Sequence, residues 1–211
     1  LAATRGAFVG LIAAIVFGTI YFVYSHKTWR KWLLLGLFIF ILVVTLLIYF
    51  RDTSFVKSIP GSRIFDISLK SQNLVDRMMI WQMAFEGWKQ RPILGWGPEN
   101  FIQIFDRHYL TDYWIKGGDK SWFDRAHSIY FDYLAETGIL GLLSFLAIFV
   151  VFYWLLFKNS KSQFLNLESR KNNLLIFNTL IFALPVAYLV QGIVLFDVLP
   201  IYLNLFIFLA F

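Results

Sequence analysis

Long uncharged apolar runs alternate with short charged stretches along most of the chain. A membrane-spanning helix needs about 20 mostly apolar residues, within a range of about 17–25. Runs that suggest spans lie at residues 7–24, 32–50, 137–157 and 174–196, with a shorter one at 198–211. Pro185 predicts a kink in the fourth run, which a membrane helix tolerates when neighbours satisfy the freed carbonyl. The pattern predicts an all-α fold, a polytopic transmembrane helical bundle.

Residues 51–136 form a long segment with a different pattern, rich in Trp, Phe and Ile. A connection of that length without secondary structure would be unusual in a folded protein. Met78, Trp81 and Phe85 recur at helical spacing within "NLVDRMMIWQMAFEGWKQ", which predicts a helix. The Pro and Gly residues of the following "RPILGWGPENF" predict the end of that helix.

Two further helices are expected in the second half of this long segment. One covers residues 100–109. The other begins with Asp124 as its N-cap, passes through His127 and Tyr130, and ends near Gly138. With their aromatic faces turned toward lipid or toward the bundle, all three helices would lie on the membrane surface.

The composition is that of an integral membrane protein. Apolar residues make up 59% of the chain and charged residues 15%, against about 45–50% and about 25% in soluble domains. The absence of cysteine excludes disulfides, thiol nucleophiles and Cys-based metal sites. Because the sequence starts and stops near or inside apolar runs, we expect residues 1–211 to be a single membrane domain, a fragment of a longer protein.

Charge predicts the orientation of the spans. The linkers around residues 25–31 and 158–172 together carry seven Lys and Arg residues and one Glu, whereas residues 51–136 carry eleven basic and eleven acidic residues. Short basic loops stay in the cytoplasm, and long loops translocate largely regardless of charge. We therefore expect an extracytoplasmic loop at 51–136, with Arg5 at the outer end of the first span. No basic stripe interleaved with aromatics is present, so nucleic acid is not an expected partner.

Two arginines are candidates for binding an anion at this outer face. Arg77 opens the first loop helix, and Arg5 precedes an apolar run in "AATRGAFVG". On position alone, Arg77 is explained more simply as a surface residue paired with Asp76, Glu86 or a lipid phosphate. Arg5 is explained more simply as a residue that snorkels to the outer lipid headgroups. The functional alternative is a guanidinium that makes bidentate, charge-assisted hydrogen bonds to a diphosphate.

His127 lies in a dense ionisable cluster within "WFDRAHSIYFDYLAETGILG". Histidine can accept a proton at neutral pH, although a lone histidine is more often a structural hydrogen-bonding group. Asp124, Asp132 and Glu136 could orient it or bind a divalent ion, but acids near helix ends are usually caps or surface residues. No second His or Cys stands at zinc-ligand spacing from His127. We expect no metal and no cofactor.

The order of these signals resembles the O-antigen ligase and polymerase superfamily. "RMMIWQMAFEGWKQRPILGWGPENF" is followed some thirty residues later by "RAHSIYFDYLAETGILGLL", and "TRGAFVG" is similar to a Ser-Arg-Gly stretch that precedes these motifs in the family. The match covers most of residues 1–157. Two positions depart from the pattern, because Thr4 stands where Ser is common and Ser128 stands where Asn is frequent.

The resemblance implies a lipid-linked oligosaccharide glycosyltransferase of the bacterial cytoplasmic (inner) membrane, with its active site facing the periplasm or exterior. It would move a glycan from undecaprenyl diphosphate to a hydroxyl of a glycolipid, glycan or protein acceptor, among membrane lipids and without a metal. Matched by motif, Arg5 and Arg77 would bind the diphosphate, and His127 would activate or place the acceptor. We add Arg125, from the same cluster as His127, as a substrate-binding residue.

Several alternatives stay open on sequence alone. Ligases, polysaccharide polymerases and protein O-glycosyltransferases of this superfamily share one donor chemistry. A transporter is a weaker alternative, because such proteins usually place ionisable residues within the spans near the midplane, and the four longer runs are uncharged. A non-catalytic membrane scaffold would leave the linked motifs unexplained.

Overall fold

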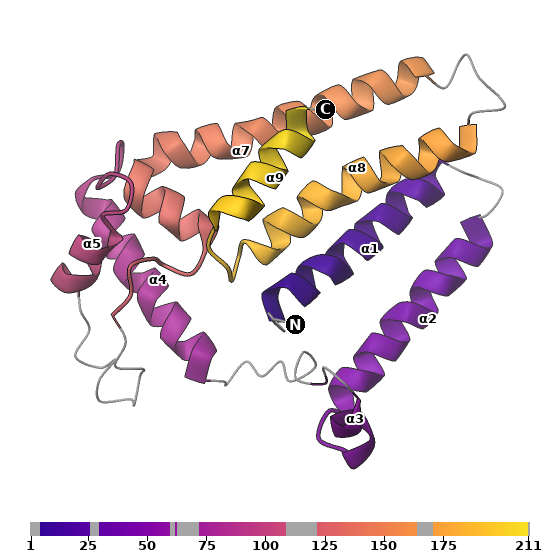
Figure 1. Ribbon diagram of the computed structural model, residues 1–211, viewed down its shortest axis with the longest axis horizontal. Helices are drawn as coiled ribbons and strands as arrows, with labels where there is room; N and C mark the ends of the chain where they lie inside the picture. Colours follow the sequence, from indigo (N-terminus) through magenta and orange to yellow (C-terminus); the bar gives the residue numbers. More distant parts are fainter. Residues whose placement is uncertain are drawn as a thin grey trace. The chain divides into compact units, whose positions relative to one another are not determined.

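The computed structural model describes residues 5–25, 30–59, 62, 72–108, 122–163 and 171–210. Within these ranges the regular structure is helical and no strand is present, which confirms the predicted all-α fold (Figure 1). Among the described helices, those that are long and apolar enough to cross a membrane lie at Gly6–Tyr24, Arg30–Tyr49 and Ile129–Lys158. Shorter apolar helices cover Phe177–Gln191 and Leu199–Ala210. Helix length and composition are those of a polytopic membrane protein.

The chain divides into two compact units. The first consists of Leu1–Ser68 and Tyr153–Gln191, and the second of Leu69–Phe152 and Gly192–Phe211. The boundary falls inside α7, Ile129–Gln163, so this helix contributes residues to both units.

In the first unit, α1 (Arg5–Ser25) and α8 (Lys171–Gln191) lie side by side and antiparallel (Figure 1). Glycines of α1 allow this close approach. A Cβ at Gly10 would lie 2.7 Å from the carbonyl oxygen of Ala187, and one at Gly18 would lie 3.2 Å from the Cβ of Ala183. Small residues let membrane helices approach closely enough for extensive van der Waals contact. The unit also contains α2 (Arg30–Tyr49) and the short α3 (Ser54–Ser58).

Pro185 lies inside α8 and is buried. A proline within a helix has no N–H to donate and its ring disturbs the preceding turn, so carbonyls there need other donors. The Tyr153 hydroxyl supplies one of them, since it donates to the carbonyl oxygen of Phe182 at 3.0 Å. The Tyr153 side chain, which belongs to α7, thus stabilises the proline-containing turn of α8.

The second unit contains α4 (Gln72–Gln90), α5 (Phe101–Arg107), the first part of α7 and α9 (Leu199–Ala210). Its core is a cluster of buried apolar side chains from α4, α5 and α7 and from the turn that follows α4. Its members include Ile80, Met83, Trp96, Phe101 and Ile104. On α4 the buried face therefore runs through Ile80 and Met83, whereas Met78 and Phe85 of the predicted stripe are exposed.

Several helix ends differ from those expected. The α5 helix covers Phe101–Arg107 with Asn100 as N-cap, close to the expected range of 100–109, whose last residue lies outside the described part of the chain. The apolar run at 174–196 does not form one helix, because α8 ends at Gln191. Residues 192–198 are non-helical, and the chain becomes helical again at α9.

Candidate functional site

A break in α7 at Gly138 joins two parts of the second unit. Gly138 has φ 68° and ψ −168°, which are not helical angles, and α7 continues beyond it. The sequence predicted that the helix ends near Gly138, but the helix is only interrupted there. In an unbroken α-helix, the N–H groups of Ile139 and Leu140 would bond to carbonyls four residues earlier. Here the N–H of Ile139 donates to Pro92 O at 2.9 Å, and that of Leu140 to Ile93 O at 3.5 Å.

The carbonyls released by this break also find partners in the turn that follows α4. The N–H of Trp96 donates to Ala135 O at 3.0 Å, and the N–H of Gly97 donates to Glu136 O at 2.8 Å. Buried backbone polar groups are almost always paired. Here the bonds to the turn after α4 replace the lost helical bonds, so the N–H and C=O groups named above remain hydrogen-bonded. The "ILGWG" and "ETGIL" stretches are therefore hydrogen-bonded to each other, a contact that sequence spacing did not predict.

Glycine is required on both sides of this contact. A Cβ on Gly95 would lie 2.5 Å from the backbone of Glu136, and one on Gly138 would lie 2.3 Å from Ile93 O. Both glycines have positive φ, a conformation that L side chains rarely adopt. The two backbones touch directly, which fixes the start of α7 against the end of α4.

The residues before α7 form a turn, which contradicts the predicted helix start. Asp124 is not the N-cap, because the helix begins at Ile129. Asp132 instead reaches back, and its Oδ1 accepts a hydrogen bond of 2.6 Å from the N–H of Ala126. His127 has φ 57°, a left-handed conformation that is uncommon outside glycine. A local side-chain bond and a positive-φ residue therefore replace the helical turn that sequence alone predicted.

Residues 192–198, between α8 and α9, hold this turn in place. The N–H of Ile129 lies 2.9 Å from Gly192 O and 3.0 Å from Leu195 O. The buried Ser128 hydroxyl donates to Gly192 O at 3.4 Å. The first backbone donor of α7, the N–H of Ile129, is thus satisfied by a segment more than sixty residues later in the sequence.

The arginine and histidine candidates of the second unit meet on this same segment. Arg77 of α4 donates from Nη1 to the carbonyl oxygen of Val194. Arg125 Nη1 donates to Asp197 O at 3.4 Å, and its guanidinium lies 5.6 Å from the Phe196 ring centroid. The His127 ring packs edge-on against Phe196, with centroids 5.0 Å apart. Arg77, Arg125 and His127 therefore contact residues that follow one another closely along the chain.

The hydrogen bond of His127 indicates which ring nitrogen carries the hydrogen in the neutral side chain. Its Nδ1 lies 3.2 Å from the carbonyl oxygen of Arg125. A carbonyl can only accept, so Nδ1 carries the hydrogen, and in the neutral ring Nε2 has a lone pair. Phe123 packs on the ring as well, with centroids 5.3 Å apart. The aromatic contacts and the backbone bond hold an imidazole whose Nε2 can accept a proton.

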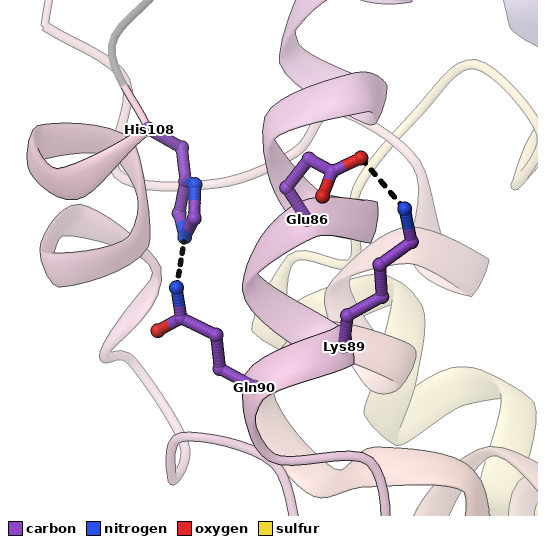
Figure 2. A network of polar contacts seen from close by, with 4 residues as sticks. All are labelled: Glu86, Lys89, Gln90 and His108. Atoms are coloured by element: carbon purple, nitrogen blue, oxygen red, sulfur yellow. Dashed lines mark hydrogen bonds and ion pairs between the residues drawn. The ribbon is translucent and has the colours of Figure 1, made fainter.

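Another histidine, His108, has a different setting. It follows α5, and its Nε2 lies 3.1 Å from the Gln90 amide of α4 (Figure 2). Beside it on α4, Lys89 and Glu86 form an exposed ion pair of 2.8 Å (Figure 2). The Gln90–His108 contact ties α4 to α5 at the surface. His108 and Glu86 provide matched positions for testing His127 and the acidic residues.

The arginines differ in their surroundings. Arg77 is half-buried, and this burial lowers the pKa of its guanidinium, which still stays protonated at neutral pH. Arg125 is also partly exposed, and its Nη2 lies 3.9 Å from Glu99 Oε1, a long and weak ion pair. Arg5 is the first residue of α1, in the other unit, and its side chain lies outside the described part of the chain. Its expected place beside Arg77 and His127 stays a prediction.

The acidic residues of the cluster have separate positions. Asp132 bonds to the turn before α7, whereas Asp124 is exposed. Among the residues that the structure describes, no three His, Cys, Asp or Glu side chains are grouped so that they could hold a metal ion. Asp197 joins Asp132 and Glu136 at a pocket near the start of α7. Sequence reasoning missed Asp197, although its charge between two apolar runs was a visible signal.

Comparison with known families and proteins gives one match. A family model described as O-antigen ligase matches residues 1–146. No curated protein matches the chain, and no solved structure matches it.

Proposed function

Because this chain belongs to the O-antigen ligase family, with ligase-type function in surface polysaccharide biosynthesis, we propose a specific reaction for it. The protein transfers a glycan from undecaprenyl diphosphate to an acceptor hydroxyl at the outer face of the bacterial cytoplasmic membrane. The observation that carries this proposal is the contact of Arg77, Arg125 and His127 with the single segment 192–198. Val194 and Phe196 are two residues apart, a span of at most about 7 Å.

The reaction joins the acceptor oxygen to the anomeric carbon of the donor sugar. As this bond forms, the bond between the anomeric carbon and the diphosphate oxygen breaks, and its electron pair leaves with undecaprenyl diphosphate. The acceptor proton passes to Nε2 of His127, which becomes an imidazolium. The tautomer set by the Arg125 carbonyl supports this role, because it leaves Nε2 able to accept. A positioned base contributes typically about 10²–10⁴-fold to such a step.

Fixed cations stabilise the leaving group. Negative charge grows on the diphosphate oxygen as the bond breaks, and preorganised donors in a site poor in water stabilise that charge strongly. Arg77 is partly buried and held by Val194 O, so its orientation is set before the donor binds. We assign Arg77 and Arg5 to the diphosphate, and Arg125, whose guanidinium is partly exposed, to binding of substrate beside His127.

Three substitutions in the intact protein test this mechanism. His127→Asn removes the base while asparagine tolerates the left-handed backbone, so transfer should fall at least about 100-fold. Arg77→Lys keeps the positive charge but loses the planar guanidinium that can bond bidentately, so it should also reduce glycan transfer severely. His108→Ala, the matched control, should keep normal transfer, because His108 bonds only at the α4–α5 surface in the described structure.

The measurement is glycan transfer from a purified undecaprenyl diphosphate-linked donor, with the amount of protein in the membrane checked for each variant. Normal transfer by both His127→Asn and Arg77→Lys would contradict the mechanism. Mass spectrometry of glycolipids, free polysaccharide and glycoproteins from a deletion strain would then distinguish a ligase from a polymerase or a protein O-glycosyltransferase.

A further inference from the structure

A polar pocket of about 330 Å³ lies beside the turn that contains His127. Arg125 and Ile129, on either side of His127 in the sequence, both line it. The polar groups around it come from the start of α7, from residue 197 and from α9. They include Arg125, Asp132, Tyr133, Glu136, Asp197 and Tyr202. Ligand sites in proteins are commonly about 300–1,000 Å³ with a few convergent polar groups, so this pocket has the size for a small ligand.

The charge of the pocket argues against an anion as its ligand. Three carboxylic residues, Asp132, Glu136 and Asp197, share it with the single guanidinium of Arg125. A diphosphate would add further negative charge beside these groups, and like charges brought together are destabilising. The diphosphate leaving group therefore belongs beside Arg77 and Arg5, outside this pocket, and the pocket suits a neutral or cationic ligand.

The arrangement of hydrogen-bonding groups indicates a ligand with hydroxyl groups. Carboxylates accept, guanidinium groups donate, and phenols do both. The Tyr133 ring stacks on Phe145 with centroids 4.3 Å apart. The Tyr133 side chain is thus held in place by a protein contact, which reduces the entropy lost on binding.

A divalent cation is a poorer fit. The acidic residues at the pocket are not grouped as metal ligands among the residues that the structure describes. Two aromatic rings in the lining also suit the apolar face of a sugar better than a hydrated ion.

We infer that this pocket binds the hydroxyl-rich sugar that accepts the glycan, and so places its nucleophilic hydroxyl beside His127. The inference rests on the proposed function. It assigns Glu136 and Tyr202 as acceptor-binding residues, distinct from the arginines assigned to the diphosphate. Selectivity follows from charge, since neutral and amino sugars should enter while phosphorylated sugars should be repelled.

Two substitutions test the pocket in the intact protein. Glu136→Gln keeps the size of the side chain and one accepting oxygen but removes the charge, and Tyr202→Phe keeps the ring but removes the hydroxyl. Each should raise the KM for acceptor about three- to tenfold, the loss expected for one hydrogen bond, with the KM for donor unchanged. Glu86→Gln is the matched control, because Glu86 lies in an exposed ion pair on α4 (Figure 2), and its kinetics should be those of the wild type.

Competition provides a second measurement that does not depend on the variants. Methyl glucoside and methyl glucosaminide should inhibit wild-type transfer competitively with acceptor, and glucose 6-phosphate at the same concentrations should not. Unchanged acceptor KM in both pocket variants, or stronger inhibition by glucose 6-phosphate than by methyl glucoside, would overturn the pocket assignment while wild-type transfer persists. Absence of transfer by the wild type would instead refute the proposed function and the pocket assignment with it.

Discussion

Replacing Gly138 with alanine should unfold the start of α7. The residue has φ 68° and ψ −168°, a region that is essentially restricted to glycine and costs other residues about 1–3 kcal/mol. The new Cβ would also lie 2.3 Å from Ile93 O and 2.7 Å from the N–H nitrogen of Leu94, both of them backbone atoms. Relief of that clash requires the 92–97 turn to move away.

The expected magnitude follows from the bonds that this movement breaks. The bonds from Ile139 to Pro92 O and from Leu140 to Ile93 O contribute about 0.5–1.5 kcal/mol each. Together with the backbone conformation, the loss in free energy of unfolding is about 2–6 kcal/mol. For a chain of this size, such a loss lowers Tm by at least about 4 °C.

Thermal unfolding in detergent, followed by tryptophan fluorescence, measures this change. Gly36→Ala is the matched control, because no atom of another described segment lies within 4 Å of a Cβ at Gly36 and Gly36 is not among the described glycines with positive φ, so Tm should not fall. A Gly138→Ala variant that melts with the wild type and keeps full transfer would refute the reasoning that the two motifs require direct backbone contact.

Three other predictions concern the remaining elements. Tyr153→Phe removes the hydroxyl that donates to Phe182 O, so Tm should fall by about 1–6 °C; an unchanged Tm would show that the proline turn needs no such donor. Gly10→Ala places a Cβ 2.7 Å from Ala187 O, so α1 and α8 should separate and Tm should fall in the same assay, whereas wild-type stability would mean that the helices repack without loss. Chelation by EDTA should leave glycan transfer intact, because the described acidic residues are not grouped as metal ligands; inhibition that added Mg²⁺ reverses would contradict this.

The helices themselves were predictable from the sequence, because apolar periodicity and length depend on local residues. The turn before α7 was not, since the side chain of Asp132 bonds backward to Ala126 and competes with the cap expected from Asp124. Residues 192–196 were read as the end of a membrane helix because Ile193, Val194, Leu195 and Phe196 are apolar. The backbone carbonyls of this segment accept hydrogen bonds from Arg77, Ser128 and Ile129. Hydropathy describes side chains, so it could not predict these bonds.

Of the candidate site, Arg77 and His127 could be selected from motif resemblance and Arg125 from its place beside His127, but the common contact of these three residues could not be predicted. It depends on a hydrogen-bonding partner far away in the sequence, which no local pattern encodes. Glu136 and Asp132 were noticed as possible caps, ion ligands or residues that orient His127. The pocket they share with Tyr202 arises from the return of α9 to the start of α7.

The position of residues 192–198 has a consequence for how much of the chain the proposed catalytic residues need. The family match ends at residue 146, yet the carbonyls that receive Arg77 and Arg125 and the ring beside His127 come from beyond it. A fragment that ends at residue 146 would retain every motif residue but lose residues 192–198, which Arg77, Arg125 and His127 contact. Expression boundaries should therefore extend past Tyr202, and a truncated protein that binds nothing would say little about the motifs themselves.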